Sequence, residues 1–75
     1  MKITVKLIGP LIYEGGFSEK ELALPGNMTA GELRAYVKID SKRPAIITRN
    51  GRAVADSDAL ADGDRVVISH IYSGG

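Results

Sequence analysis

The segment from Lys2 to Ile8 constrains the fold most, because apolar and polar side chains alternate strictly along it. Ile3, Val5 and Leu7 fall on one face, and the lysines and the threonine fall on the other. A period of two residues is typical of a strand with one buried face. The chain therefore begins with a half-buried strand, which Gly9-Pro10 ends.

The absence of cysteine limits both the fold and the chemistry of this 75-residue chain. A single domain of this size buries only about 60% of the surface that its unfolded form exposes. Without cysteine, neither a disulfide framework nor a thiolate metal site can stabilise it. No side chain can hold a thioester or a persulfide, so any sulfur chemistry would have to use the carboxyl terminus.

The charge balance argues against nucleic-acid and membrane partners. Ten basic and nine acidic residues give a formal charge of +1, and neither sign forms a long run. One phenylalanine, three tyrosines and no tryptophan leave little for a platform on which bases could stack. The sequence has no 18-residue apolar stretch and no signal-peptide pattern, so we expect a cytoplasmic protein.

A hairpin and a helix are predicted after the first strand. Gly15-Gly16 indicates a loop, and residues 17–24 form a second extended run. Thr29 and Glu32 have the spacing of a capping box at a helix start, which predicts a helix over residues 30–39. On this helix Leu33, Tyr36 and Val37 form the stripe expected to pack against the sheet. The residues expected to face water are Glu32, Arg34 and Lys38.

The second half of the chain reads as three strands. Residues 45–49 and 52–54 flank Asn50-Gly51, which is the strongest short-range hairpin signal in the sequence. The last strand, residues 65–72, is apolar on both faces near its middle, which suits a central position.

The order of these elements predicts an α+β fold of the β-grasp, ubiquitin-like type. We expect a mixed sheet of four to five strands, with the first and last strands central and parallel and one helix across one face. The other face stays open unless a partner covers it. The β-grasp domain is expected over residues 1–72, followed by a flexible diglycine tail over residues 73–75.

The terminal pair Gly74-Gly75 is the main functional candidate. Glycine has no Cβ, so Ser73, Gly74 and Gly75 form a thin segment that can thread into the active site of another enzyme. A frayed chain end without a role is the alternative interpretation. Beside such a tail, Val67, Ile71 and Tyr72 are expected to form a partner-docking surface on the open face of the last strand, although scattered surface apolarity is also common.

Other candidate sites fail on their spacing. His70 is the only histidine and has no serine, cysteine or acid arranged with it as a catalytic set. Counting from Asp56 places Ala61 where a calcium loop needs glycine, so the aspartates between residues 56 and 64 are interpreted as turn formers. We therefore assign no catalytic residue and no metal site.

The stretch from Leu60 to Gly75 resembles the ThiS/MoaD family of ubiquitin-like sulfur carriers, in its Asp62-Gly63-Asp64 segment, apolar strand and diglycine ending. The resemblance implies that a MoeB/ThiF-like enzyme adenylates the Gly75 carboxylate and that a thiocarboxylate then forms there. ATP is used by that enzyme, and the carrier binds no cofactor. The sulfur acceptor implied is either thiazole synthase or the large subunit of molybdopterin synthase.

Three functions remain open at this stage. The sulfur carrier is a protein cosubstrate and not an enzyme, and its thiamine-pathway, molybdopterin and tungstopterin versions are not distinguished. A ubiquitin-like modifier would use the same activated Gly75 carboxylate to acylate a lysine of another protein. A β-grasp binding module would use the open sheet face and carry an inert tail.

Overall fold

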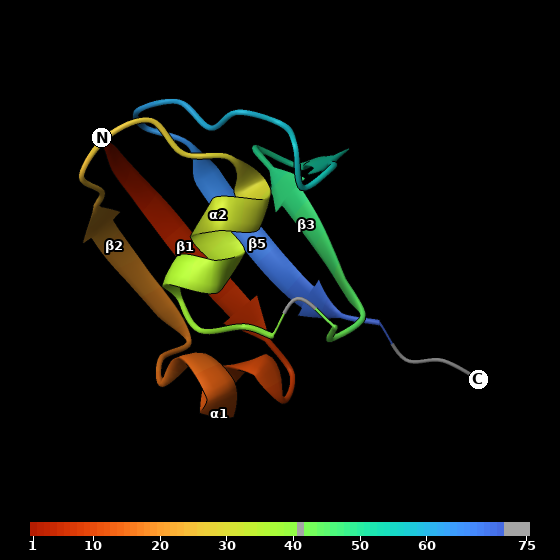
Figure 1. Cartoon of the computed structure of the whole chain (residues 1–75). Coiled ribbons are helices and arrows are strands. Elements are labelled where there is room, and N and C mark those ends of the chain that lie inside the picture. Colours follow the sequence, from red (N-terminus) through yellow and green to blue (C-terminus); the bar gives the residue numbers. More distant parts are fainter. Residues whose placement is uncertain (41, 72–75) are drawn as a thin grey trace.

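The computed structural model describes residues 1–40 and 42–71 as one mixed sheet with two helices (Figure 1). In chain order the elements are β1 (Lys2–Ile8), α1 (Leu11–Gly15), β2 (Glu19–Ala23), α2 (Ala30–Tyr36), β3 (Ala45–Arg49), β4 (Arg52–Val54) and β5 (Arg65–His70). The predicted α+β, β-grasp architecture is confirmed.

The two terminal strands form the centre of the sheet, as predicted. The strand order among the described residues is β2-β1-β5-β3-β4, with β1 and β5 parallel and the other pairs antiparallel. Thr4 pairs with Arg65 and Ile8 pairs with Ser69, so the carboxyl ends of these two parallel strands lie side by side at the same end of the sheet.

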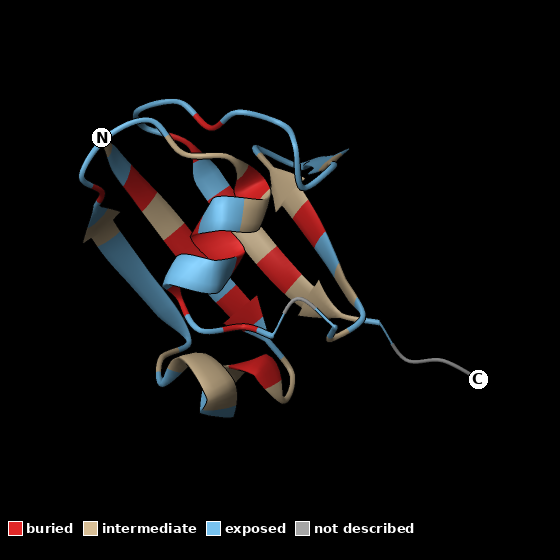
Figure 2. Ribbon diagram, in the orientation of Figure 1, coloured by how far each residue is buried: buried red, intermediate tan, exposed pale blue. Residues whose placement is uncertain are grey.

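The core lies between the sheet and α2, which crosses one sheet face (Figure 1). Buried positions alternate along β1 with the predicted period of two, and Val66 and Ile68 are the buried residues of β5 (Figure 2). The buried apolar side chains are Ile3, Val5, Leu7, Leu11, Leu24, Ala30, Leu33, Val37, Ile39, Ile47, Leu60, Val66 and Ile68. The opposite face of the sheet carries no helix in the described part of the chain.

A short helix, α1, replaces the loop predicted between the first two strands. It is five residues long and packs the fully buried side chain of Leu11 into the core. Gly16 ends the helix with φ of 83°, and its N–H donates to the Ile12 carbonyl oxygen at 2.8 Å. A single turn is too short to show a helical period, so the sequence pattern missed it. β2 begins at Glu19, after the predicted start.

The start of α2 is as predicted, but its end is not. Thr29 Oγ1 accepts from the Glu32 N–H at 3.1 Å, and Glu32 Oε1 accepts from the Thr29 N–H at 2.9 Å. This reciprocal pair is the predicted capping box. The helix ends at Tyr36 because Lys38 adopts a left-handed backbone with φ of 68°.

The faces of α2 differ from the prediction at two residues. Arg34 is only 6% exposed, whereas Tyr36 is 49% exposed. The Arg34 guanidinium donates to the Asp40 carbonyl oxygen at 2.6 Å and also to the carbonyl oxygen of Arg43. These bonds keep the charged group inside, since buried cations persist only when they are hydrogen-bonded. Leu33 and Val37 are buried as predicted.

Candidate functional site

An apolar patch lies on the open face of the sheet, at the carboxyl end of β5. Ile8 is 43% exposed, Ile46 is 47% exposed and Ile71 is 38% exposed. Ser69 of β5 pairs with Ile8 on one side and Ile46 on the other, so three strands converge here. The three exposed isoleucines and the partly buried Val67 form what we call the open-face patch: Ile8, Ile46, Val67 and Ile71.

Two of the predicted docking residues belong to this patch. Val67 lies on β5, and Ile71 follows that strand directly. Tyr72, the third predicted residue, lies outside the described residues. Sequence reasoning missed Ile8 and Ile46, although Ile8 carried a signal, because it is the one large apolar residue on the otherwise polar face of β1.

The end of β5 is tied to the loop that precedes β3. The Ile71 N–H donates to the Pro44 carbonyl oxygen at 3.1 Å, and His70 pairs with Ala45. The predicted tail residues Ser73, Gly74 and Gly75 lie outside the described residues. Ile71 is therefore the last residue described before the tail in the sequence, and its backbone is fixed by this bond.

The Asp62-Gly63-Asp64 segment directly precedes β5 and is bonded to the start of β1. Asp62 Oδ1 accepts from the Lys2 N–H at 2.6 Å, and the Gly63 N–H donates to the Lys2 carbonyl oxygen at 2.7 Å. Gly63 has φ of 86°, which favours glycine. The segment that carries the family resemblance is therefore a structural turn.

The buried side chain of Asp64 links the turn at Asn50 to the turn at Ala61. Its buried carboxylate accepts from the Ala61 N–H at 2.7 Å and from the Asn50 side-chain amide at 3.0 Å. The interpretation of the aspartates as turn formers is thus confirmed for Asp62 and Asp64. Among the described residues no group of three or more histidine, aspartate or glutamate side chains could hold a metal ion.

Charged side chains of β1, β2 and β5 lie on the open face outside the patch. Arg65 and Glu19 form an ion pair at 2.9 Å across β1, and Lys2 lies 3.9 Å from Glu21. Exposed pairs of this kind contribute little to stability. Their effect is to divide the open face into a charged region and the open-face patch.

This topology is that of a class of protein, the ubiquitin-like β-grasp proteins. The family model described as the ThiS family matches residues 5–75. The chain therefore belongs to the ThiS family, which confirms the resemblance to ThiS/MoaD sulfur carriers. Members of this family are small carrier proteins.

Solved structures share the fold of this chain. SAMP1 from Haloferax volcanii is 26% identical over all of both chains, with a TM-score of 0.77. The ubiquitin of Caldiarchaeum subterraneum is 32% identical over 100% of this chain and 98% of its own, with a TM-score of 0.63. A chain from the complex of subunits 1 and 2 of the Helicobacter pylori molybdopterin-converting factor is 20% identical over all of both chains, with a TM-score of 0.67.

A comparison with curated protein sequences finds no match. Neither helix in the described part of the chain is long and apolar enough to cross a membrane.

Proposed function

We propose that this protein is a sulfur carrier whose Gly75 carboxylate is activated and then converted to a thiocarboxylate. The observation that carries the proposal is the match to the ThiS family, which extends to Gly75 itself. The absence of cysteine supports it, because no side chain offers a thiol on which sulfur could travel. The carboxyl terminus is then the group left to carry it.

The proposed chemistry has three steps and takes place in a partner enzyme. A Gly75 carboxylate oxygen attacks the α-phosphorus of ATP, which forms an acyl-adenylate and releases pyrophosphate. The outer sulfur of a persulfide donor then attacks the acyl carbon, which displaces AMP and forms an acyl disulfide. A second thiolate attacks the donor's sulfur in that disulfide, so the S–S bond breaks, the thiocarboxylate leaves with the electron pair, and the two thiols end as a disulfide. A MoeB/ThiF-like enzyme binds the ATP and supplies the catalytic groups, and Ser73 and Gly74 provide the narrow segment that enters it.

The open-face patch is the proposed docking surface for that enzyme. Four residues beyond Ile71 can reach at most about 14 Å when extended. An active site that receives Gly75 must therefore lie close to Ile71, and the surface that it covers must surround that residue. The exposed isoleucines of the patch are the apolar side chains that lie there.

The adenylation step can be tested by itself. The full chain is added to a MoeB/ThiF-type enzyme with ATP, and pyrophosphate release is measured. We expect release that depends on the carrier and is lost when Gly75 is deleted. Equal release with the full and the shortened chain contradicts the proposal.

The sulfur acceptor is proposed to be a synthase, either thiazole synthase or the large subunit of molybdopterin synthase. The Helicobacter pylori relative is described as a complex of subunits 1 and 2 of the molybdopterin-converting factor. Mixing the thiocarboxylate form with each purified synthase distinguishes the two, because only the true acceptor returns the carrier to the carboxylate in the presence of its other substrates.

Protein modification is a second candidate function. It is favoured by the likeness to SAMP1, a small archaeal modifier protein, and by the 32% identity to an archaeal ubiquitin. The same adenylate would then be attacked by a lysine amine of another protein. Covalent adducts on cellular lysines that disappear when Gly75 is deleted would support this function over sulfur transfer.

A further inference from the structure

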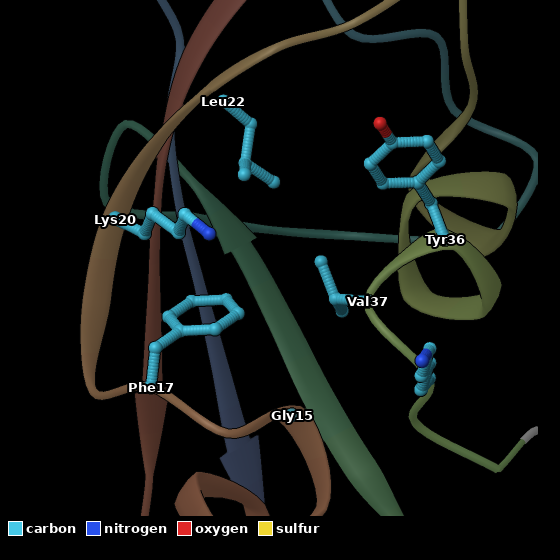
Figure 3. A pocket seen from close by; sticks show the side chains of 7 residues that line it. Gly15, Phe17, Lys20, Leu22, Tyr36 and Val37 are labelled. Carbon is cyan, nitrogen blue, oxygen red and sulfur yellow. The ribbon is translucent and has the colours of Figure 1, made fainter.

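A second candidate site lies on the other side of the molecule, between β2 and the end of α2. The structure has a hollow of about 240 Å³ there, open to solvent. Figure 3 shows side chains from the β2 segment facing side chains from the α2 segment across it. The lining includes Phe17, Lys20 and Leu22 on one side and Tyr36, Val37 and Lys38 on the other.

The strand beside this hollow is an unprotected edge of the sheet. β2 is the outermost strand and pairs only with β1 in the described sheet (Figure 1). The Leu24 N–H donates to the Met1 carbonyl oxygen at 2.7 Å, and the Leu7 N–H donates to the Ser18 carbonyl oxygen at 2.8 Å. The backbone N–H and carbonyl groups of the even-numbered residues in this segment therefore point toward β1.

Because backbone groups alternate along a strand, the odd-numbered residues Glu19, Glu21 and Ala23 direct their N–H and carbonyl groups outward. Such a row of backbone groups is a template for one more strand.

We propose that this edge and hollow together bind an extended segment of a partner protein. The segment pairs antiparallel to β2, inserts an apolar side chain into the hollow, and places acidic side chains beside Lys20 and Lys38. Strand addition of this kind takes affinity from main-chain hydrogen bonds and specificity from pockets for alternate side chains. The inference concerns a surface other than the open-face patch and does not depend on tail activation.

The size of the hollow favours a side chain over a free small molecule. Ligand pockets usually measure about 300–1,000 Å³, which is more than this hollow offers. Its apolar part, formed by Phe17, Leu22 and Val37, suits one branched aliphatic side chain. The neighbouring edge then supplies the additional contacts that one side chain lacks.

The charge of the lining selects acidic segments. Lys20 lies with its Nζ 6.0 Å from the centre of the Phe17 ring, and Lys38 lies at the opposite rim. Among the residues that the structure describes, no carboxylate lines the hollow. Acidic side chains two residues away from the inserted apolar one therefore meet complementary charge, and basic ones meet repulsion.

A second copy of this chain fits the edge poorly. The outward backbone groups belong to odd-numbered residues in both copies, so an antiparallel pair sets Glu19 or Glu21 of one copy against Glu21 of the other. Like charges directly opposite each other destabilise a strand pair. The occupant is therefore a different chain.

The probe for this site is the blocked peptide acetyl-Asp-Thr-Ile-Thr-Ile-Thr-Asp-amide, titrated into the ¹⁵N-labelled full chain. In the proposed pairing its aspartates and isoleucines face the hollow, and its threonine N–H groups face β2. We expect NMR shift changes at Glu19, Glu21 and Ala23 and at Tyr36–Lys38, with slower amide exchange at the three β2 residues.

Two modified peptides serve as matched controls. Replacing both aspartates with lysine should weaken binding about tenfold, from the loss of two favourable charge pairs and the gain of two repulsive ones. N-methylation of the central threonine should abolish binding, whereas N-methylation of an isoleucine, whose N–H faces away from β2, should change it less than twofold.

Two protein variants complete the test. Glu21→Pro removes an outward N–H and leaves the β1 pairing intact, whereas Glu21→Thr loses the same charge and keeps the donor. We expect the proline variant alone to lose binding. If it does not fold, Lys38→Asn tests the charge, since asparagine tolerates positive φ. Equal binding by all variants, shifts confined to the open-face patch, or self-association through β2 would overturn the proposal.

Discussion

The N–H of Ile71 donates a hydrogen bond to the carbonyl oxygen of Pro44 at 3.1 Å, which joins the last described residue to the loop before β3. That loop is held in turn by the buried Arg34, through its bonds to the carbonyl oxygens of Asp40 and Arg43. Arg43 also pairs with Glu14 of α1. The last residue described before the tail is therefore connected to both helices.

Arg34→Met tests this connection. Methionine keeps the length of the apolar stem but leaves two carbonyl groups without their donor, so we expect a loss of about 2–3 kcal/mol in the free energy of unfolding. Urea denaturation measures it. Arg52→Met, at an exposed position on β4, is the control and should change stability by less than about 0.5 kcal/mol. Equal stability of the two variants would show that the bonds of Arg34 to this loop do not stabilise the fold.

The open-face patch predicts a specific kinetic defect. Ile46→Glu places a charge in the proposed enzyme contact, so KM for the carrier in the adenylation reaction should rise at least about tenfold, as for a disrupted interface residue. The urea midpoint should stay near that of the unmodified chain.

Tyr36→Glu is the matched control for that experiment. Tyr36 is 49% exposed, close to the 47% of Ile46, but lies on α2, which crosses the opposite face of the sheet (Figure 1). Its substitution should leave KM unchanged. Similar KM values for the two variants would mean that the patch does not contact the enzyme.

Gly31→Ala should destabilise the fold, although alanine is the better helix former by about 1 kcal/mol. A Cβ at Gly31 would lie 3.0 Å from Asp56 Cβ and 3.1 Å from the Asp56 carbonyl oxygen, which also accepts from the Gly31 N–H at 2.9 Å. At Gly26 an added Cβ meets nothing within 4 Å, so Gly26→Ala should be neutral. A higher thermal midpoint for Gly31→Ala than for the unmodified chain would contradict this prediction, because it would show that Asp56 moves away from the new Cβ at little cost.

Gly74→Val tests the threading of the tail. The branched side chain should block adenylation while the urea midpoint stays unchanged, because the clash arises only inside the partner's active site. Pyrophosphate release measures the adenylation, and urea denaturation measures the stability. Normal release by this variant would contradict a narrow entry path.

The parts of the fold that depend on local chemistry were predictable from the sequence. Alternation along Lys2–Ile8 identified the first strand, and the Thr29 and Glu32 pair identified the start of α2. Asn50 and Gly51 take the positive φ values of 51° and 86° that their hairpin requires. In each case the signal lies within a few residues of the feature.

The features that depend on distant contacts were not predictable. Arg34 resembles any polar helix residue until the loop at Asp40 and Arg43 folds back to accept its hydrogen bonds. Ile8 and Ile46 lie 38 positions apart, and only the pairing of both strands with β5 brings them to one patch. The hollow beside β2 likewise requires the end of α2 to be placed against the sheet edge.

The central claim is that the Gly75 carboxylate carries sulfur. Its most direct test is the intact mass of the full chain after incubation with a MoeB/ThiF-type enzyme, ATP and a sulfur donor. We predict an increase equal to the mass difference between sulfur and oxygen, located by fragmentation at Gly75 and absent without ATP. An unchanged mass, under conditions that convert a known carrier completely, would contradict the account.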